Sequence, residues 1–212
     1  MLKIAKFTFN PLQENTYVLY NNGKAVVIDP GMYHKNEQDA FDLFIEKNNL
    51  VLEKIINTHC HLDHIAGVSY LQNKYKVPFF IPKGELEVLK SAPISAQMYG
   101  LQMFQNVEEY FFLENEGIVE IAGVDFEILF VPGHSPGHLA FYNEKEEILV
   151  VGDVLFQGSC GRYDLPGGNL SVLKDSIFNT LFKLPDNTQV VCGHGPHTTI
   201  GKEKINNIIN QL

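Results

Sequence analysis

The order of hydrophobic and polar positions predicts a chain that alternates between strands and helices. Short stretches of alternating or continuous apolar residues predict strands, and apolar residues at helical spacing predict helices. The predicted strands are residues 4–9, 16–20, 24–28, 54–57, 77–81, 111–113, 118–121, 126–131, 139–142, 148–151 and 189–192. The predicted helices are residues 39–48, 68–75, 170–182 and 202–209, and residues 85–103 are expected to form a helix or an irregular cover interrupted by Pro93.

The strands fall into two runs, each mixed with helices. This order favours an α/β fold with two sheets that face each other and helices on the outside. The chain has 212 residues, of which 45% are hydrophobic, and no linker, internal repeat or low-complexity tract. We therefore expect one globular domain over residues 1–212.

The net charge, the N-terminus and the cysteines indicate which kinds of partner the protein binds and in which cellular compartment it acts. The formal net charge of -9 predicts repulsion of nucleic acid. The N-terminus has no apolar signal core, and no apolar run is long enough to cross a bilayer. The three cysteines, Cys60, Cys160 and Cys192, are odd in number and widely spaced, which does not indicate a disulfide framework. These features predict a cytoplasmic protein with reduced thiols and no membrane partner.

The segment from Thr58 to His64 carries the clearest chemical signal. It directly follows a predicted strand, and it contains His59, His61, Asp63 and His64. Imidazole and carboxylate together suit zinc, iron or manganese better than calcium or magnesium. A single histidine or aspartate would more often be a hydrogen-bonded surface residue, but four such groups beside one strand end favour a metal.

Three further candidate ligands lie downstream, each just past a predicted strand. They are His134, Asp153 and His194, each preceded by a glycine that permits a turn or a close approach. Loops at strand ends commonly gather active-site residues. With the segment at 58–64 they make seven candidate ligands.

These motifs resemble the metallo-β-lactamase superfamily over nearly the whole chain. The resemblance implies a four-layer αββα sandwich and two divalent ions, expected to be zinc, with iron or manganese as alternatives. It assigns one ion to His59, His61 and His134, assigns the other to Asp63, His64 and His194, and places Asp153 between the two ions. Asp63 and Asp153 are expected to be catalytic carboxylates as well as ligands. Asp29 resembles the family's acid that orients a ligand histidine, although turn capping is an alternative role.

Within the superfamily, residues 158–168 and 193–201 resemble the short, single-domain relatives of glyoxalase II. That resemblance predicts hydrolysis of a small-molecule thioester such as 2-hydroxyacyl-glutathione by a metal-bridging hydroxide. Arg162 matches a basic residue that binds the glutathione part, or it pairs with Asp164 to order its loop. The chain lacks the C-terminal helical domain that contributes glutathione contacts in full-length glyoxalase II.

Other activities on the same scaffold remain open from the sequence. A mononuclear iron persulfide dioxygenase would use His59, His134 and Asp153 as its facial ligands. A lactonase would need only the same activated water. A nuclease is disfavoured by the acidic charge, and a purely structural metal site is disfavoured because seven ligands around two ions leave room for water.

Overall fold

The computed structural model describes residues 1–212 and divides into two compact units. The first unit contains Met1–Leu113 with Glu120–Val124, and the second contains Glu114–Val119 with Asp125–Leu212. Each unit has one six-stranded sheet and its own helices. The mixed α/β class is therefore confirmed, whereas the single domain over residues 1–212 stays a prediction.

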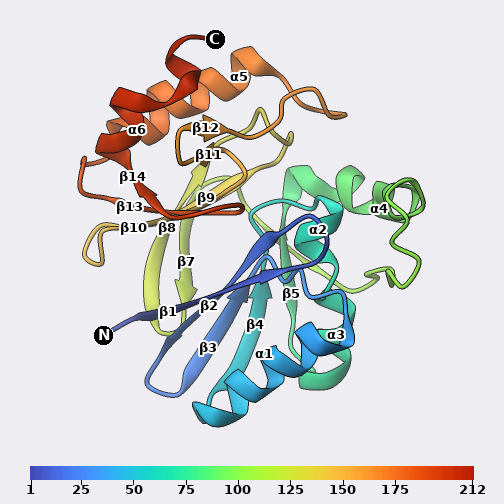
Figure 1. Cartoon of the computed structure of the whole chain (residues 1–212). Helices are drawn as coiled ribbons and strands as arrows, with labels where there is room; N and C mark the ends of the chain where they lie inside the picture. The colour runs from blue at the N-terminus through green and yellow to red at the C-terminus, as the bar shows by residue number, and fades with distance from the viewer. The chain divides into compact units, whose positions relative to one another are not determined.

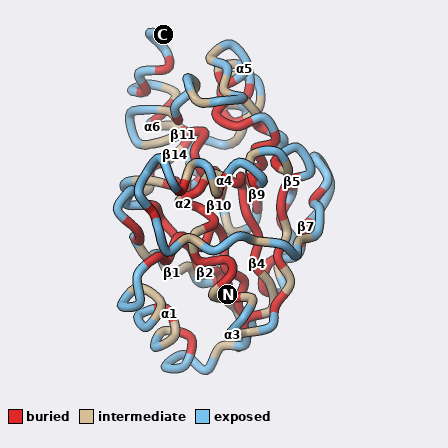
Figure 2. Tube along the Cα trace, turned by 90° about the vertical axis from the view of Figure 1, so that its right-hand side faces the viewer, coloured by how far each residue is buried: buried red, intermediate tan, exposed pale blue.

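The sheet of the first unit has the order β1-β2-β3-β4-β5-β6. The pairs from β1 to β3 are antiparallel, and those from β3 to β6 are parallel. The strands are β1 Lys3–Phe9, β2 Glu14–Asn21, β3 Lys24–Ile28, β4 Val51–Ile56, β5 Phe79–Pro82 and β6 Phe111–Leu113. Strand β2 is mostly buried, as Figure 2 shows, and in β4 Leu52, Ile55 and Ile56 are buried.

Helices of the first unit cover its sheet because their apolar faces complete its core. They are α1 Lys35–Lys47, α2 Leu62–Ile65, α3 Val68–Tyr75 and α4 Leu86–Met98. Phe41 and Ile45 of α1 and Leu71 of α3 pack with Val27 and Ile55 of the strands. Figure 1 shows α1 and α3 beside β3 and β4.

The second unit repeats this plan with a sheet of order β14-β13-β10-β9-β8-β7. Its strands are β7 Gly117–Ile121, β8 Val124–Phe130, β9 Leu139–Asn143, β10 Ile148–Gly152, β13 Gln189–Cys192 and β14 Thr198–Thr199, and β11 Leu155–Phe156 pairs with β12 Ser159–Cys160 in a small hairpin. The helices are α5 Leu170–Asp175, which continues through a π-helical turn to Lys183, and α6 Ile200–Asn206. Leu173, Ile177 and Ile200 pack these helices on Leu149 and Val190.

Most predicted elements are present, and the differences have physical reasons. The helix predicted from residue 39 begins at Lys35, because the Glu37 carboxylate accepts a hydrogen bond from the His34 N–H and closes the first turn. Pro93 lies inside α4 and does not interrupt it, since Leu89, Ala92 and Ala96 hold that helix in the core. The two-residue strands β11, β12 and β14 are too short to show a hydrophobic period.

Candidate metal centre

In the first unit, two neighbouring parallel strands end at one sheet edge, and the candidate ligands of residues 58–64 follow one of them. Ile28 at the end of β3 pairs with Ile56 at the end of β4. Asp29 follows the first strand, and residues 58–64, here called the histidine loop, follow the second. Asn57 closes this loop, because its Nδ2 donates to the carbonyl oxygens of His59 at 3.0 Å and His64 at 2.8 Å.

Asp29 lies at the centre of the polar contacts behind the histidine loop. Its Oδ1 accepts from the Thr58 N–H at 2.7 Å, and its Oδ2 accepts from the Thr58 hydroxyl at 2.7 Å. The same Oδ2 lies 3.2 Å from Nδ1 of His64. Asp29 has a φ of 51°, a left-handed conformation that aspartate tolerates better than most residues. Asp29 therefore contacts both the Thr58 end of the histidine loop and the His64 ring, and its role as an orienting acid stays a prediction.

The four candidate ligands of the histidine loop lie close together. The ring of His59 is 4.8 Å from that of His61 and 4.2 Å from that of His64, between centroids. Asp63 Oδ2 is 3.7 Å from Nε2 of His64. Thr58 Oγ1 lies 3.0 Å from Nδ1 of His59 and donates its own proton to Asp29. Nδ1 of His59 therefore carries the ring proton and donates to Thr58 Oγ1, and the unprotonated Nε2 is the atom that can bind a metal.

Further buried groups of the first unit support the loop, and sequence reasoning missed them. Glu85, fully buried after β5, accepts a hydrogen bond from the Cys60 N–H at 2.9 Å. Asn10 donates to the carbonyl oxygens of Gly31 and Asp63, both at 3.0 Å. The Cys60 side chain lies in the hydrophobic core, and burial raises the pKa of its thiol well above the ordinary value. Cys60 therefore packs in the core rather than acting as a thiolate.

In the second unit, two more parallel strands present Asp153 and His194. Gly152 at the end of β10 pairs with Cys192 at the end of β13, after an irregularity in register that follows Val150. The Gly193 N–H donates to the Gly152 carbonyl at 2.8 Å, which holds the segments that follow β10 and β13 side by side. The Nε2 of His194 lies 3.4 Å from Oδ2 of Asp153.

His134 approaches the same carboxylate from the loop after β8. Its Nε2 lies 3.7 Å from Oδ2 of Asp153, and its Nδ1 lies 2.7 Å from the backbone carbonyl oxygen of Arg162. A carbonyl oxygen only accepts, so Nδ1 of His134 carries the proton and Nε2 is directed to Asp153. A Cβ added at Gly161 would lie 1.8 Å from the Asp153 carbonyl oxygen and 2.9 Å from Nδ1 of His134, so glycine is required there.

His138 and Arg162 support this region differently. The Asp153 N–H donates to Nε2 of His138 at 3.1 Å, which places His138 beside the candidate site as a hydrogen-bond acceptor. The Arg162 guanidinium forms a two-pronged ion pair with Asp164, with both N···O distances 2.9 Å. The hydrogen bond from Arg162 lowers the pKa of Asp164. Both side chains are exposed, and the pairing that the sequence left open is formed.

The donor atoms within each unit fit a divalent ion. Two donors that share a tetrahedral zinc ion, with bonds of about 2.0–2.1 Å, lie about 3.3–3.4 Å apart. The distances of 3.4–3.7 Å from Asp153 to His134 and His194, and from Asp63 to His64, are close to that value and longer than a good hydrogen bond.

Comparison with known proteins identifies the family. The sequence profile of the metallo-β-lactamase superfamily matches residues 9–194. The chain belongs to this superfamily. It is 35% identical over 201 residues to the hydroxyacylglutathione hydrolase GloC of Haemophilus influenzae, covering 92% of each protein.

Solved structures of other superfamily members share the fold of this chain. BLEG-1, a B3 metallo-β-lactamase, superposes with a TM-score of 0.88 at 35% identity, covering 98% of this chain and 99% of the other. TTHA1623, solved in a di-iron-bound form, superposes with a TM-score of 0.85 at 35% identity, covering 96% and 98%. The chain is therefore a metal-dependent hydrolase with the metallo-β-lactamase fold. None of its helices is long and apolar enough to cross a membrane.

Proposed function

We propose that this metallo-β-lactamase superfamily member is a thioesterase that cleaves 2-hydroxyacyl-glutathione or a related small-molecule thioester at two zinc ions. The observation that carries the proposal is the 35% identity to GloC, a hydroxyacylglutathione hydrolase, over 92% of both chains. Iron is the alternative metal, since TTHA1623 was solved in a di-iron-bound form. We also propose that the enzyme acts in the cytoplasm.

The proposed centre uses the seven candidate ligands that the sequence motifs indicate. His59, His61 and His134 would hold one ion, Asp63, His64 and His194 the other, and Asp153 would bind both. When bound, the ions supply a water activated near neutral pH and an electrophile for the carbonyl oxygen of the substrate. Asp63 and Asp153 are proposed to be the catalytic carboxylates.

The chain's own contacts prepare the donor atoms for this role. Thr58 Oγ1 near Nδ1 of His59 and the Arg162 carbonyl at Nδ1 of His134 fix the protons of those rings away from the metal side. Each ring therefore offers Nε2 without a change of tautomer. Because a thiol has a pKa of about 8.5, the leaving group can depart as a thiolate without a general acid.

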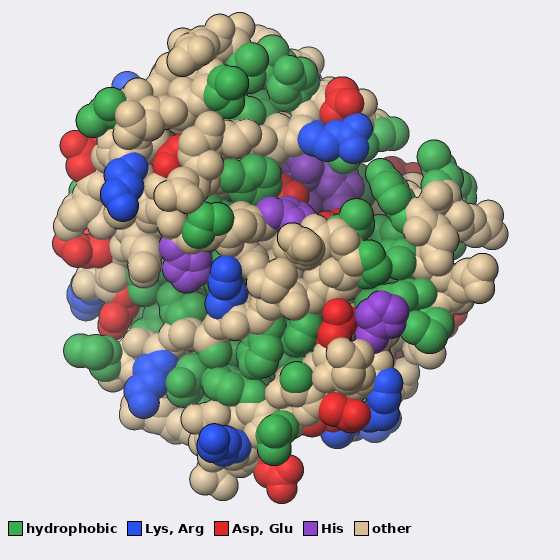
Figure 3. Space-filling model, viewed as in Figure 1, with side chains coloured by type: hydrophobic (Ala, Val, Ile, Leu, Met, Phe, Trp, Pro, Cys, Tyr) green, Lys and Arg blue, Asp and Glu red, His purple; other side chains and the backbone are tan.

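The surface favours a small substrate over nucleic acid. Lys and Arg side chains are scattered among acidic and apolar ones on the face drawn in Figure 3. The net charge is -9. A nucleic-acid partner would instead need basic side chains gathered along one face.

The test is a substrate panel run on purified protein together with elemental analysis. We expect two zinc ions per chain, hydrolysis of S-lactoylglutathione, and slower cleavage of simple lactones. Oxygen uptake with glutathione persulfide is measured in parallel. One iron per chain with oxygen consumption and no thioester cleavage would refute the proposal in favour of the dioxygenase. Cleavage of lactones alone would refute it in favour of a lactonase.

A further inference from the structure

Glu14 is a fully buried carboxyl group behind the histidine loop, and neither the sequence nor the superfamily motifs single it out. It is the first residue of β2. Its Oε2 accepts a hydrogen bond from the Thr16 hydroxyl at 2.9 Å, and its Oε1 lies 3.9 Å from Nδ1 of His64. A Cβ at Gly31 would lie 2.0 Å from Oε2, so glycine makes the space for this carboxyl group.

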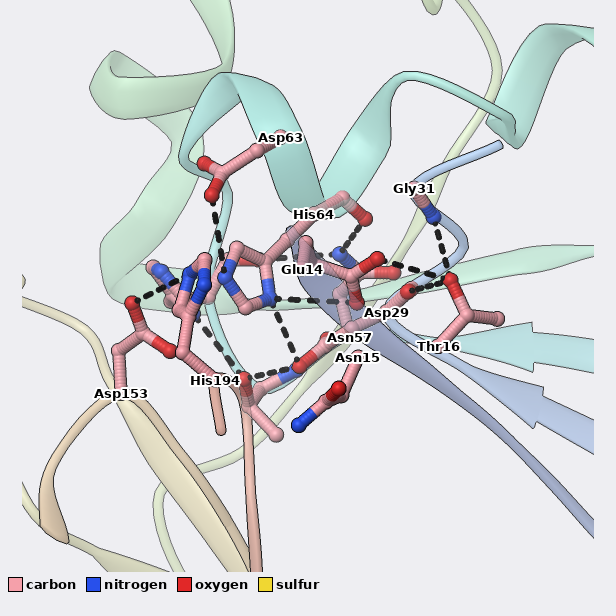
Figure 4. A network of polar contacts seen from close by, with 12 residues as sticks. Glu14, Asn15, Thr16, Asp29, Gly31, Asn57, Asp63, His64, Asp153 and His194 are labelled. Atoms are coloured by element: carbon pink, nitrogen blue, oxygen red, sulfur yellow. Dashed lines mark hydrogen bonds and ion pairs between the residues drawn. The ribbon is translucent and has the colours of Figure 1, made fainter. Parts of the chain in front are cut away.

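Glu14 and Asp29 face the same nitrogen of the same ligand. Figure 4 shows both carboxyl groups directed at the His64 ring, on the side away from Asp63. Asp29 Oδ2 also accepts from the Thr58 hydroxyl, and it lies 3.2 Å from Nδ1 of His64. The oxygen of Glu14 nearest to His64 is not the one that Thr16 contacts.

We infer that Glu14 is a positioning residue for His64. The carboxyl oxygens of Glu14 and Asp29, at 3.9 Å and 3.2 Å from Nδ1, act electrostatically to favour the imidazole proton on that nitrogen, which leaves Nε2 for the metal. Glu14 itself is not a ligand, because it lies at Nδ1, whereas Asp63 lies at Nε2. The inference rests on the metal centre and not on the thioester as substrate.

Burial of Glu14 argues against a role in packing alone. Placing a carboxyl group in a dry interior costs free energy that leucine or methionine of similar volume would avoid. A polar group kept at this cost beside a metal ligand is best explained by its effect on that ligand.

Zinc affinity, measured by chelator competition without substrate, tests the inference. Outer groups that orient ligands typically change metal affinity about 10- to 100-fold when they are removed. We expect Glu14→Leu to weaken one of the two zinc affinities by that factor, and Glu14→Gln, which retains an oxygen acceptor, to weaken it by less than about threefold. Asp42→Asn is the matched control, because Asp42 is a carboxylate of the same unit that contacts Tyr70, Lys74 and Tyr75 and no candidate ligand.

A double substitution keeps the test decisive if Glu14→Leu fails to fold. In an Asp29→Asn background, Glu14 is the remaining acid at His64, so Glu14→Gln should weaken zinc binding by more than it does alone. The ¹⁵N shifts of the zinc-free imidazole should show His64 protonated at Nδ1 in the wild type, and mixed tautomers in the double variant. The inference would be overturned if Glu14→Gln weakened zinc binding equally with and without Asp29→Asn and the His64 tautomer stayed unchanged. Wild-type zinc affinity in a folded Glu14→Leu protein would overturn it as well.

Discussion

The two units hold their candidate ligands in different ways. In the first unit, the histidine loop is bonded to buried polar side chains on several sides, including Asp29, Asn57 and Glu85. In the second unit, backbone atoms provide much of this support. The Arg162 carbonyl orients His134, and the Gly152 carbonyl accepts from the N–H of Gly193, the residue before His194. The first loop should therefore be sensitive to polar side-chain substitutions, and the second to changes that displace the backbone.

The largest effect is expected at Asp153, where the contacts of the second unit meet. Asp153→Ala removes the carboxylate next to both His134 and His194. We expect kcat/KM for S-lactoylglutathione to fall by about 1000-fold or more and the metal content to drop, because several kcal/mol of metal assistance are lost. Elemental analysis and steady-state kinetics measure both, with Asp125→Ala, an exposed carboxylate of the same unit, as control. Full activity with one ion fewer would contradict the bridging role.

A change at Gly161 tests whether backbone placement controls the second unit. In Gly161→Ala the new methyl group would lie 1.8 Å from the Asp153 carbonyl oxygen, so either Asp153 or the hairpin must move. A displacement of about 1 Å can cost about 100-fold in rate, and we expect a loss of 10- to 100-fold in kcat/KM with weaker metal binding.

Gly158→Ala is the control for this change. Gly158 lies in the turn of the β11–β12 hairpin that Gly161 follows, at a φ of +71°, and no atom lies within 4 Å of its added Cβ. It should suffer backbone strain without loss of metal. Equal metal affinity in Gly161→Ala and the wild type would show that the backbone of this loop does not set the ligand geometry.

The same contrast explains what the sequence could predict. His59, His61, Asp63 and His64 are visible because they are adjacent in the chain and their side chains are chemically distinctive. Glu85 was missed because its partner, the Cys60 N–H, is 25 residues away and belongs to the backbone. The Arg162 carbonyl gives no signal at all, since every residue has one.

The fold was predictable to a similar extent, for a related reason. The strands β3, β6 and β13 and the helix α3 have the predicted bounds, because each is long enough, or sharply enough bounded by turn residues, to show its pattern. The contacts behind the histidine loop are long-range, as in the pairing of Thr58 with Asp29 across 29 positions. No local pattern encodes such pairs, so they became visible only in three dimensions.

Asp42 tests whether the stability of the first unit and its metal binding are separable. Burial raises the pKa of Asp42, but hydrogen bonds from Lys74, Tyr70 and Tyr75 outweigh it, and the net pKa is lowered. The pKa of Asp42 is lower in the folded protein than in the unfolded protein, where it is about 3.9. The carboxylate therefore stabilises the folded protein at pH values above about 3.9, and this contribution is lost as the pH falls through the folded pKa. Asp42→Asn should therefore lower the free energy of unfolding by about 1–2 kcal/mol at pH 7.

The measurement is denaturant unfolding of the wild type and Asp42→Asn from pH 7 to pH 3. Below about pH 4 the difference between the two proteins should shrink, because the wild-type carboxylate becomes protonated. Zinc affinity should be unchanged at pH 7. A difference that grows on acidification would contradict the sign of the pKa shift, and a parallel loss of zinc would mean that the α1–α3 layer and the ligand loop are coupled.

The smallest effect is expected at the Arg162 side chain, which distinguishes binding of substrate from ordering of the loop. Its guanidinium is paired with Asp164 on the surface, and exposed pairs contribute little to stability. Arg162→Ala leaves the backbone carbonyl that orients His134, so the metal content should stay at the wild-type value. If the guanidinium exchanges Asp164 for a substrate carboxylate, KM for S-lactoylglutathione should rise about two- to fivefold at constant kcat.

A neutral thioester, S-lactoyl-N-acetylcysteamine, provides the matching control substrate, because it has no carboxylate for Arg162 to bind. Its KM should be the same in the wild type and Arg162→Ala. Asp164→Asn releases the guanidinium from its competitor, so KM for the anionic thioester should fall slightly in that variant. If Arg162→Ala leaves both KM values unchanged, the ion pair only orders the loop, and recognition of the thiol carrier must come from other residues.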